Sequence, residues 1–202
     1  MRVTLFDYGA GNLHSLAKAL GSPGVDVRVE ADPAAATDTD LLVLPGVGAF
    51  GPAAAALAPA RERMRDAVRS GLPCLGVCLG MQLLFDLSEE GEGRGLGVVP
   101  GRVRRLRSRR QPHMGWNALE PAGPQPLLEA SGLVTAYFAH SFACEPDDAG
   151  AVCAWTSHED DRFASVVRSG GVTGVQFHPE KSSAAGVSLL RALVAAARDG
   201  AA

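Results

Sequence analysis

Short apolar segments alternate with helical segments through the first half of the chain, and this alternation limits the fold more than any other feature. The predicted strands are Arg2–Asp7, Val25–Glu30, Asp40–Leu44 and Leu72–Val77. The predicted helices are 12–20, 52–70 with a break near Pro59, and 79–88. A continuously apolar strand such as Asp40–Leu44 fits the centre of a parallel sheet, where both faces are buried. The alternation therefore predicts a parallel sheet with helices on both faces.

Beyond Gly95, the predicted strands follow one another with few helices between them. They are Val98–Leu106, Leu133–Ala139, Ala151–Thr156, Phe163–Ser169 and Val172–Phe177. This pattern indicates antiparallel strands appended to the parallel sheet. An alanine-rich helix over Ser182–Arg198 closes the chain, with Ser182 as its N-cap. The sequence has no internal repeat and no long linker, so residues 1–202 are predicted to form one mixed α/β domain.

Composition and charge exclude several classes of protein. Apolar residues make up 47% of the 202 residues, and the formal net charge is −3. A globular but acidic chain is not expected to bind nucleic acid, which requires a basic surface. Apolar runs fall short of the ~18–20 residues of a membrane span, and the N-terminal run ends at Asp7, too early for a signal peptide. We expect a cytoplasmic protein with neither a membrane nor a nucleic acid as partner.

The four cysteines are expected to be reduced thiols in that compartment. They stand at Cys74, Cys78, Cys144 and Cys153, and no pair has the C-x-x-C spacing of a metal site. We therefore predict no structural metal and no cofactor. A lone cysteine is most often a buried core residue, and Cys74, Cys144 and Cys153 are assigned to the core.

Cys78 differs because it lies between two glycines at a strand-to-helix junction, Gly76-Val77-Cys78-Leu79-Gly80. The same arrangement holds the nucleophile of G-x-S-x-G enzymes on a sharp turn, where Cβ atoms two residues away would clash. The amino end of the following helix favours a thiolate. The sequence indicates a cysteine nucleophile; a buried structural cysteine in a glycine-rich turn is the alternative.

A base and an orienting group are expected beside such a nucleophile. Among the five histidines, His178 stands out because it ends an apolar strand and precedes Pro179 and Glu180. In an extended segment, His178 and Glu180 would project to the same side. The segment therefore predicts a histidine base oriented by a carboxylate; a plain strand end at the surface is the alternative.

The glycine-rich segment Pro45-Gly46-Val47-Gly48 directly follows the predicted central strand. Loops at the carboxyl ends of neighbouring parallel strands converge on one crevice, so this loop should meet the turn at Cys78. Its backbone and the N–H of Leu79 could then form an oxyanion hole. An ordinary glycine turn is one alternative, and a phosphate loop, which lacks its Gly-Lys-Ser/Thr ending here, is another.

These motifs together carry a resemblance to a known family. Gly76-Val77-Cys78-Leu79-Gly80-Met81-Gln82 and Gly174-Val175-Gln176-Phe177-His178-Pro179-Glu180 resemble class I (triad) glutamine amidotransferases. The further segments 7–12, 45–50, 112–117, 137–142 and 178–182 narrow the resemblance to the glutaminase subunits of imidazole glycerol phosphate synthase. The motifs run in the family's order across nearly the whole chain. The resemblance implies a class I amidotransferase fold, which is flavodoxin-like.

The resemblance also implies roles for individual residues. Cys78 would attack the glutamine amide to form a thioester and release ammonia, with His178 as base and acid and Glu180 as its orienting group. Ammonia would pass to a cyclase subunit, a (β/α)₈ barrel that makes imidazole glycerol phosphate and AICAR in histidine biosynthesis. The oxyanion and glutamine-binding positions would be Gly46, Val47, Gly48, Leu79, Gln82, His140, Ser141 and Phe142.

Two residues are candidates for contact with the partner subunit, because they lie in motifs particular to this family. They are Asn12 and Trp116. Asn12 also fits as the cap of the first helix, and Trp116 fits equally as a core residue. The arginine-rich segment 102–110 is predicted to be a solvated hairpin face rather than a binding patch.

Other functions stay open on the sequence alone. An amidotransferase serving anthranilate or aminodeoxychorismate synthesis is one, although those relatives resemble Pro-Gly-Pro-Gly at the first loop. A cysteine peptidase would leave Gln82 and the His178-Pro179-Glu180 segment unexplained. A non-catalytic interaction subunit would have no need of Cys78, His178 and Glu180 together.

Overall fold

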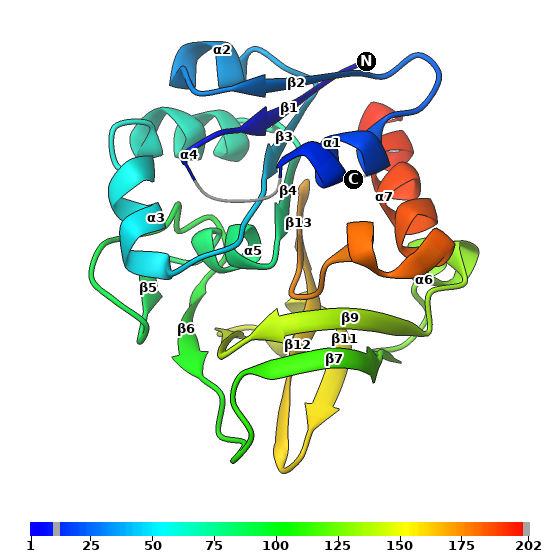
Figure 1. Cartoon of the computed structure of the whole chain (residues 1–202). Coiled ribbons are helices and arrows are strands. Elements are labelled where there is room, and N and C mark those ends of the chain that lie inside the picture. The colour runs from blue at the N-terminus through cyan, green and yellow to red at the C-terminus, as the bar shows by residue number, and fades with distance from the viewer. Residues whose placement is uncertain (10–12, 200–202) are drawn as a thin grey trace.

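The computed structural model describes residues 1–9 and 13–199, and an eight-stranded sheet forms its centre (Figure 1). The strand order is β2-β1-β3-β4-β13-β12-β11-β8. These strands are β1 (Arg2–Phe6), β2 (Asp26–Glu30), β3 (Leu41–Leu44), β4 (Cys74–Val77), β8 (Glu120–Pro121), β11 (Val152–His158), β12 (Asp161–Ser169) and β13 (Val172–Val175). Pairing is parallel from β2 to β13 and antiparallel from β13 to β8. This mixed sheet confirms the predicted fold class.

Helices cover both faces of the sheet and bury two hydrophobic cores. On one face lie α2 (Pro33–Thr37), α3 (Phe50–Leu57), α4 (Arg61–Arg69) and α5 (Leu79–Leu83). On the other lie α1 (Leu13–Leu20), α6 (Pro126–Ser131) and α7 (Ser183–Arg198). Adjacent residues of β3 divide between the two cores, with Leu42 in one and Val43 in the other, because successive side chains of a strand point to opposite faces.

Two small sheets lie below the parallel strands in Figure 1. One pairs β7 (His113–Ala118) with β9 (Thr135–His140). The other joins β5 (Leu87–Ser88), β6 (Gly101–Arg105) and β10 (Phe142–Pro146). Strands β7 and β10 are not among the strands predicted from the sequence. These sheets lie beside the carboxyl ends of β4 and β13, where they form one side of the candidate site.

The predicted helix over residues 79–88 is wrong beyond its first turn, since α5 ends at Leu83 and β5 follows. The carbonyl groups of Leu83 and Leu84 accept hydrogen bonds from Leu96 and Val98 at 2.7 and 2.9 Å. A returning segment of chain therefore takes the acceptors that a longer helix would need. The break predicted near Pro59 is confirmed by the separation of α3 from α4.

Ser182 occupies the predicted N-cap position of α7, but its side chain makes no capping hydrogen bond to this helix. Instead, its hydroxyl donates to the carbonyl of His178 at 2.6 Å and accepts from the backbone N–H of Tyr137 at 2.9 Å. Ser182 thus ties β9 to the segment that follows β13. In the described part of the chain, no helix is long and apolar enough to cross a membrane.

Backbone contact at Gly80 yields a first prediction. A Cβ atom at Gly80 would lie 1.8 Å from the carbonyl oxygen of Leu44, whereas one at Gly21 would meet nothing nearer than 3.4 Å. Gly80→Ala should therefore lower the free energy of unfolding by about 3 kcal/mol or prevent folding, and Gly21→Ala should change it little. Denaturant unfolding of both variants tests this, and equal stability would contradict the packing described.

Candidate active site

Cys78 occupies a strained turn between β4 and α5. Its backbone has φ 53° and ψ −107°, a conformation that L-residues rarely adopt. A Cβ atom at Gly76 would lie 2.6 Å from the carbonyl oxygen of Gly80, so the glycines on either side of Cys78 are sterically required. The structure confirms the predicted sharp turn, and the Cys78 side chain at the tip of this turn is buried.

His178 and Glu180 meet beside this turn. The Nδ1 atom of His178 lies 2.9 Å from Oε1 of Glu180, with both side chains almost fully buried. The backbone N–H of His178 donates to the carbonyl of Tyr137 at 2.9 Å. Residues Pro179–Lys181 form a 3-10 turn rather than the extended segment that the sequence analysis assumed. The pair forms as predicted, but through a tight turn.

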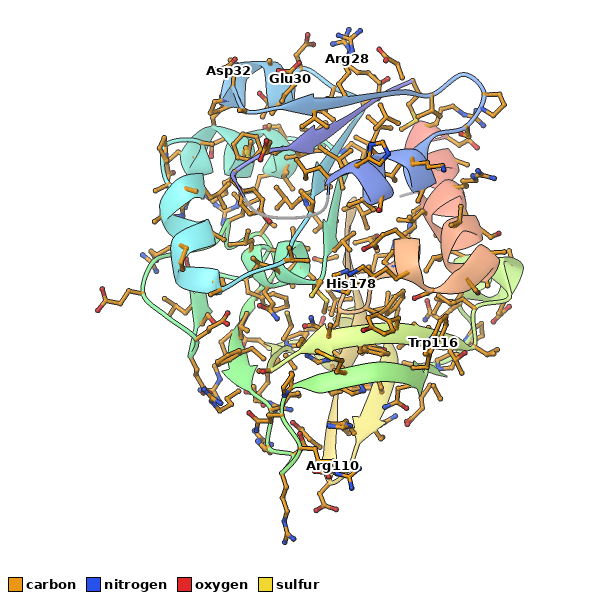
Figure 2. The ribbon with its side chains drawn as sticks, viewed as in Figure 1. Arg28, Glu30, Asp32, Arg110, Trp116 and His178 are labelled. Carbon is orange, nitrogen blue, oxygen red and sulfur yellow. The ribbon has the colours of Figure 1, made fainter. Side chains whose placement is uncertain are left out.

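The charge state of His178 follows from its two partners. Burial alone lowers the pKa of His178, but hydrogen bonds to Cys78 and Glu180 outweigh it and raise the pKa to about 9. The imidazole ring is therefore protonated at neutral pH. A cation between a thiol and a carboxylate favours negative charge on both. Figure 2 places His178 near the middle of the molecule, above the β7–β9 pair.

A cleft of about 190 Å³ opens at Cys78 and His178. The other residues that line it are Val47, Gly48, Leu79, Gln82, Glu90, Ala139, His140, Ser141, Phe142 and Lys181. The predicted glutamine-binding residues are brought together here, with the exception of Gly46. Their function as substrate contacts stays a prediction.

Gly46 lies against the first turn of α5 instead of lining the cleft. A Cβ atom at this position would lie 2.4 Å from Cβ of Leu79 and 2.7 Å from the amide nitrogen of Gly80. Gly48 has φ +121°, which an L side chain would not favour. The loop after β3 therefore meets the turn at Cys78, as the sequence analysis expects.

The side-chain amide of Gln82 already forms hydrogen bonds within the protein. Its Nε2 donates to the carbonyl of Phe142 at 3.0 Å and faces Oε1 of Gln176 at 3.4 Å. The Nε2 of Gln176 in turn donates to Sγ of Cys78 at 3.8 Å. A chain of amide groups thus connects the wall of the cleft to the thiol. Gln176 is fully buried and stands in the motif 174–180, but it is not among the site residues predicted from the sequence.

Three more residues contribute to the site that the sequence analysis does not single out. Glu90 brings a carboxylate to the cleft, where its Oε2 accepts from the N–H of Phe50 at 2.8 Å, and Lys181 brings an ammonium group. Tyr8 is buried and donates its hydroxyl to the carbonyl of Pro45, just before the glycine loop. A glutamate in a charged surface run has no sequence signature that would separate it from Glu89.

Trp116 is an exposed residue of β7, so its interpretation as a core residue is wrong. Its side chain is 57% exposed, that of Met114 on the same face is 65% exposed, and the Trp116 ring contacts Tyr137 edge-on. Figure 2 shows Trp116 at the side of the β7–β9 pair. The second predicted partner residue, Asn12, lies outside the described residues.

The arginines of the segment 102–110 are exposed, except Arg104. Arg104 is 5% exposed, and its guanidinium forms two hydrogen bonds with Asp161, at 2.7 and 2.8 Å. Arg102 and Arg107 pair with Glu145 at the surface. The solvated interpretation is therefore wrong for Arg104, which joins β6 to the start of β12.

The remaining cysteines divide between the core and the periphery. Cys74 and Cys144 are buried as predicted, and burial raises the pKa of Cys74 to about 12 and also raises that of Cys144. Cys153 is half-buried and packs against the edge of the core, so its assignment to the core holds only in part. Over residues 1–9 and 13–199, no group of three or more His, Cys, Asp or Glu side chains is placed to hold a metal ion.

Comparison with known proteins extends these observations to nearly the whole chain. The family model described as "Glutamine amidotransferase class-I" matches residues 4–195. Proteins named imidazole glycerol phosphate synthase subunit HisH are similar in sequence. The one from Halobacterium salinarum is 44% identical, over 95% of this chain and 92% of its own. That from Salinibacter ruber is 46% identical, over 93% and 91%.

Solved structures share the fold at much lower identity. A crystal structure of a glutamine amidotransferase superposes with a TM-score of 0.74 at 21% identity, covering 97% of this chain and 98% of the other. A structure of PurLQS from Thermotoga maritima gives a TM-score of 0.75 at 19% identity, covering 96% and 97%. Both superpositions agree with the fold that the family model indicates.

The raised pKa of His178 yields a second prediction. Its ordinary value is 6.5 and its folded value is about 9, so protonated His178 stabilises the fold fully below about pH 6.5. That contribution should be lost as the pH rises through about 9. Glu180→Gln removes the negative partner and should lower the pKa of His178.

Histidine ring NMR as a function of pH, on the free chain and on Glu180→Gln, measures both values. Titration of His178 near pH 6.5 in the unsubstituted chain, or no change in the variant, would contradict the geometry given above.

Proposed function

The chain belongs to the class I glutamine amidotransferases and, within them, to the HisH subunits of imidazole glycerol phosphate synthase, and on this premise we propose that Cys78, His178 and Glu180 are its catalytic triad. The observation that carries the proposal is that Cys78 and His178 line one cleft, with His178 bonded to Cys78 on one side and to the buried Glu180 on the other. We also propose that residues 1–202 act as a single amidotransferase domain.

The chain is an enzyme of histidine biosynthesis that acts as the glutaminase subunit of the synthase. It hydrolyses glutamine to glutamate and ammonia for use by a second subunit. Because the relatives are subunits of imidazole glycerol phosphate synthase, they favour that synthase as the user of the ammonia over anthranilate or aminodeoxychorismate synthesis.

The proposed chemistry proceeds in two steps. The Cys78 thiolate attacks the side-chain carbonyl of glutamine, a C–S bond forms, and the C–N bond breaks as His178 gives its proton to the departing nitrogen. Ammonia leaves and a glutamyl thioester remains. Water then attacks the thioester while His178 takes a proton, which releases glutamate and restores the thiolate. Glu180 keeps the ring of His178 oriented throughout.

Negative charge develops on the carbonyl oxygen during each attack and needs hydrogen-bond donors. We assign these donors to the backbone N–H of Leu79 and to the loop Gly46-Val47-Gly48. Gly48, at φ +121°, allows a peptide of this loop to rotate at low cost. A loop that presents its N–H only when the partner is ready would couple glutamine hydrolysis to the need for ammonia.

The cleft supplies complementary charge for an amino acid. The α-ammonium group of glutamine needs an anionic partner, and Glu90 is the carboxylate in the cleft wall besides the triad. We propose that Glu90 binds this ammonium group, while Gln82 and the segment His140–Phe142 shape the wall that holds the rest of the substrate.

The relatives are named as subunits, so a partner subunit is part of this chain's function. We propose that the partner is a (β/α)₈ cyclase in the cytoplasm and that it docks against Trp116. The exposed pair Met114 and Trp116 is an apolar patch beside the cleft, as expected of a protein interface. Asn12 stays a candidate for the same surface.

Replacing the nucleophile gives the direct test of this function. Cys78→Ala should abolish glutamine-dependent synthesis by the complex and leave ammonia-dependent synthesis within about twofold, because free ammonia bypasses the thioester. The matched control is Cys74→Ala, which alters a buried thiol in β4 and should lower stability alone. Loss of both activities in assembled Cys78→Ala complex would refute the assignment, as would loss of glutaminase activity in the control.

The Glu90 assignment predicts a change in substrate affinity. Glu90→Gln keeps an acceptor for the N–H of Phe50 but removes the charge, so KM for glutamine should rise about tenfold with kcat changed less than about threefold. Glu89→Gln alters the exposed neighbour and serves as the control. Steady-state kinetics of the complex measure both constants, and an unchanged KM in Glu90→Gln would remove Glu90 from the binding site.

A further inference from the structure

A chain of hydrogen bonds runs from the cleft to the inner face of β7. The carbonyl oxygen of Phe142 lies 2.8 Å from Nδ1 of His140, and Nε2 of His140 lies 3.1 Å from Nδ1 of His113. The Nε2 of His113 lies 3.2 Å from Nδ2 of Asn117. His113 and His140 are cross-strand partners in the β7–β9 pair. Neither His113 nor Asn117 has a part in the chemistry proposed above.

The direction of every bond in this chain is determined. The Phe142 carbonyl can only accept, so His140 carries its proton on Nδ1, and in the neutral ring Nε2 is then an acceptor. His113 must therefore donate from Nδ1, which leaves its own Nε2 as an acceptor. The amide nitrogen of Asn117 fills that position. The orientation of the Asn117 amide is itself fixed, because its Oδ1 accepts from the N–H of Ala118 at 2.8 Å.

Burial keeps both rings in this neutral state. His113 is 3% and His140 is 6% exposed, and His113 stacks on Phe138 and on His158. Burial lowers the pKa of His140 to about 3 and that of His113 to about 4, where His158 adds a smaller effect. Each ring therefore has one donor and one acceptor at neutral pH, so the chain has one arrangement.

The end of this chain is a wall of the cleft. The Phe142 carbonyl accepts from His140 and also from Nε2 of Gln82 at 3.0 Å. Gln82, His140 and Phe142 all line the cleft. A shift of the His140 ring would therefore move the carbonyl and the amide that together shape the space around the substrate.

We propose that His113 and Asn117 are positioning residues for glutamine binding, holding His140 in its Nδ1–H tautomer so that the wall at Gln82 and Phe142 keeps its shape. The inference rests on the proposed function, since it assigns the cleft to glutamine. On this proposal, the inner face of β7 supports substrate binding, while the outer face at Met114 and Trp116 remains available to a partner.

The first test compares two substitutions at His113. His113→Leu leaves the buried Nε2 of His140 without a donor and should raise KM for glutamine about tenfold, with kcat within about threefold. His113→Gln restores an N–H donor and should bring KM back to within about threefold of the original value. Both are measured in the complex, with ammonia-dependent synthesis expected to stay unchanged.

The matched control is His158→Leu. His158 stacks on His113 at 4.1 Å between ring centroids but is bonded to the carbonyl of Arg110 rather than to the chain. KM should stay within about twofold there, whereas a general packing role for His113 would give both Leu variants the same KM. Should His113→Leu fail to fold, Asn117→Ala removes the last donor of the chain together with the Asn117 bonds to Ala118 and Ser157, and it should raise KM in the same direction by a smaller factor. An unchanged KM in every variant that folds among His113→Leu and Asn117→Ala would overturn the proposal.

An NMR experiment tests this inference independently of the proposed function. Long-range ¹H–¹⁵N NMR of the histidine rings should show His113 and His140 as neutral Nδ1–H tautomers in the free chain at pH 7. A proton on Nε2 of His140 would overturn the proposal even in an active enzyme. If the assembled complex instead hydrolyses no glutamine, the proposed function fails, while the tautomers are still measured.

Discussion

Direct backbone contact at the carboxyl ends of β3 and β4 is the constraint on which the site depends. Gly80 touches the carbonyl of Leu44, Gly76 touches the carbonyl of Gly80, and Gly46 touches the first turn of α5. No side chain separates these segments, so the loop after β3 has little freedom relative to Cys78. The strained backbone of Cys78 persists because both neighbouring segments are fixed. The packing of the sheet thereby fixes where this loop lies relative to Cys78, while Gly48, at φ +121°, leaves a peptide within the loop free to rotate.

Three buried histidines next to one cleft show how partners decide what a side chain does. His178 has an acidic partner on each side and is held as a cation. His140 and His113 have only a carbonyl, an amide and each other, and they are held neutral. The first can therefore move a proton, whereas the other two can act only as oriented donors and acceptors. The charge state of each histidine is thus determined by the groups that hydrogen-bond to its ring.

The sequence predicts the parallel half of the fold well because its strands are apolar and its helices periodic. It predicts the turn at Cys78 because the turn is so tight that Cβ atoms at Gly76 and Gly80 would clash with the backbone. It fails where distant residues decide. Leu96 and Val98 end α5 by taking its acceptors, Asp161 draws Arg104 inward, and Tyr137 takes the hydroxyl of Ser182. The position of Glu90 in the cleft and the hydrogen bonds of His113 could not be predicted for the same reason, since each depends on a partner far along the chain.

The bifunctional hydroxyl of Ser182 has a consequence for engineering this subunit. One oxygen atom bonds both to β9 and to the carbonyl of His178, and β9 pairs with the strand that carries Trp116. The proposed docking residues therefore connect through this one oxygen to the proposed base His178. Under these proposals, docking strength and turnover are coupled. A redesign that strengthens docking by reshaping β7 and β9 has to preserve the register of this single hydroxyl, or the reaction slows as the complex tightens.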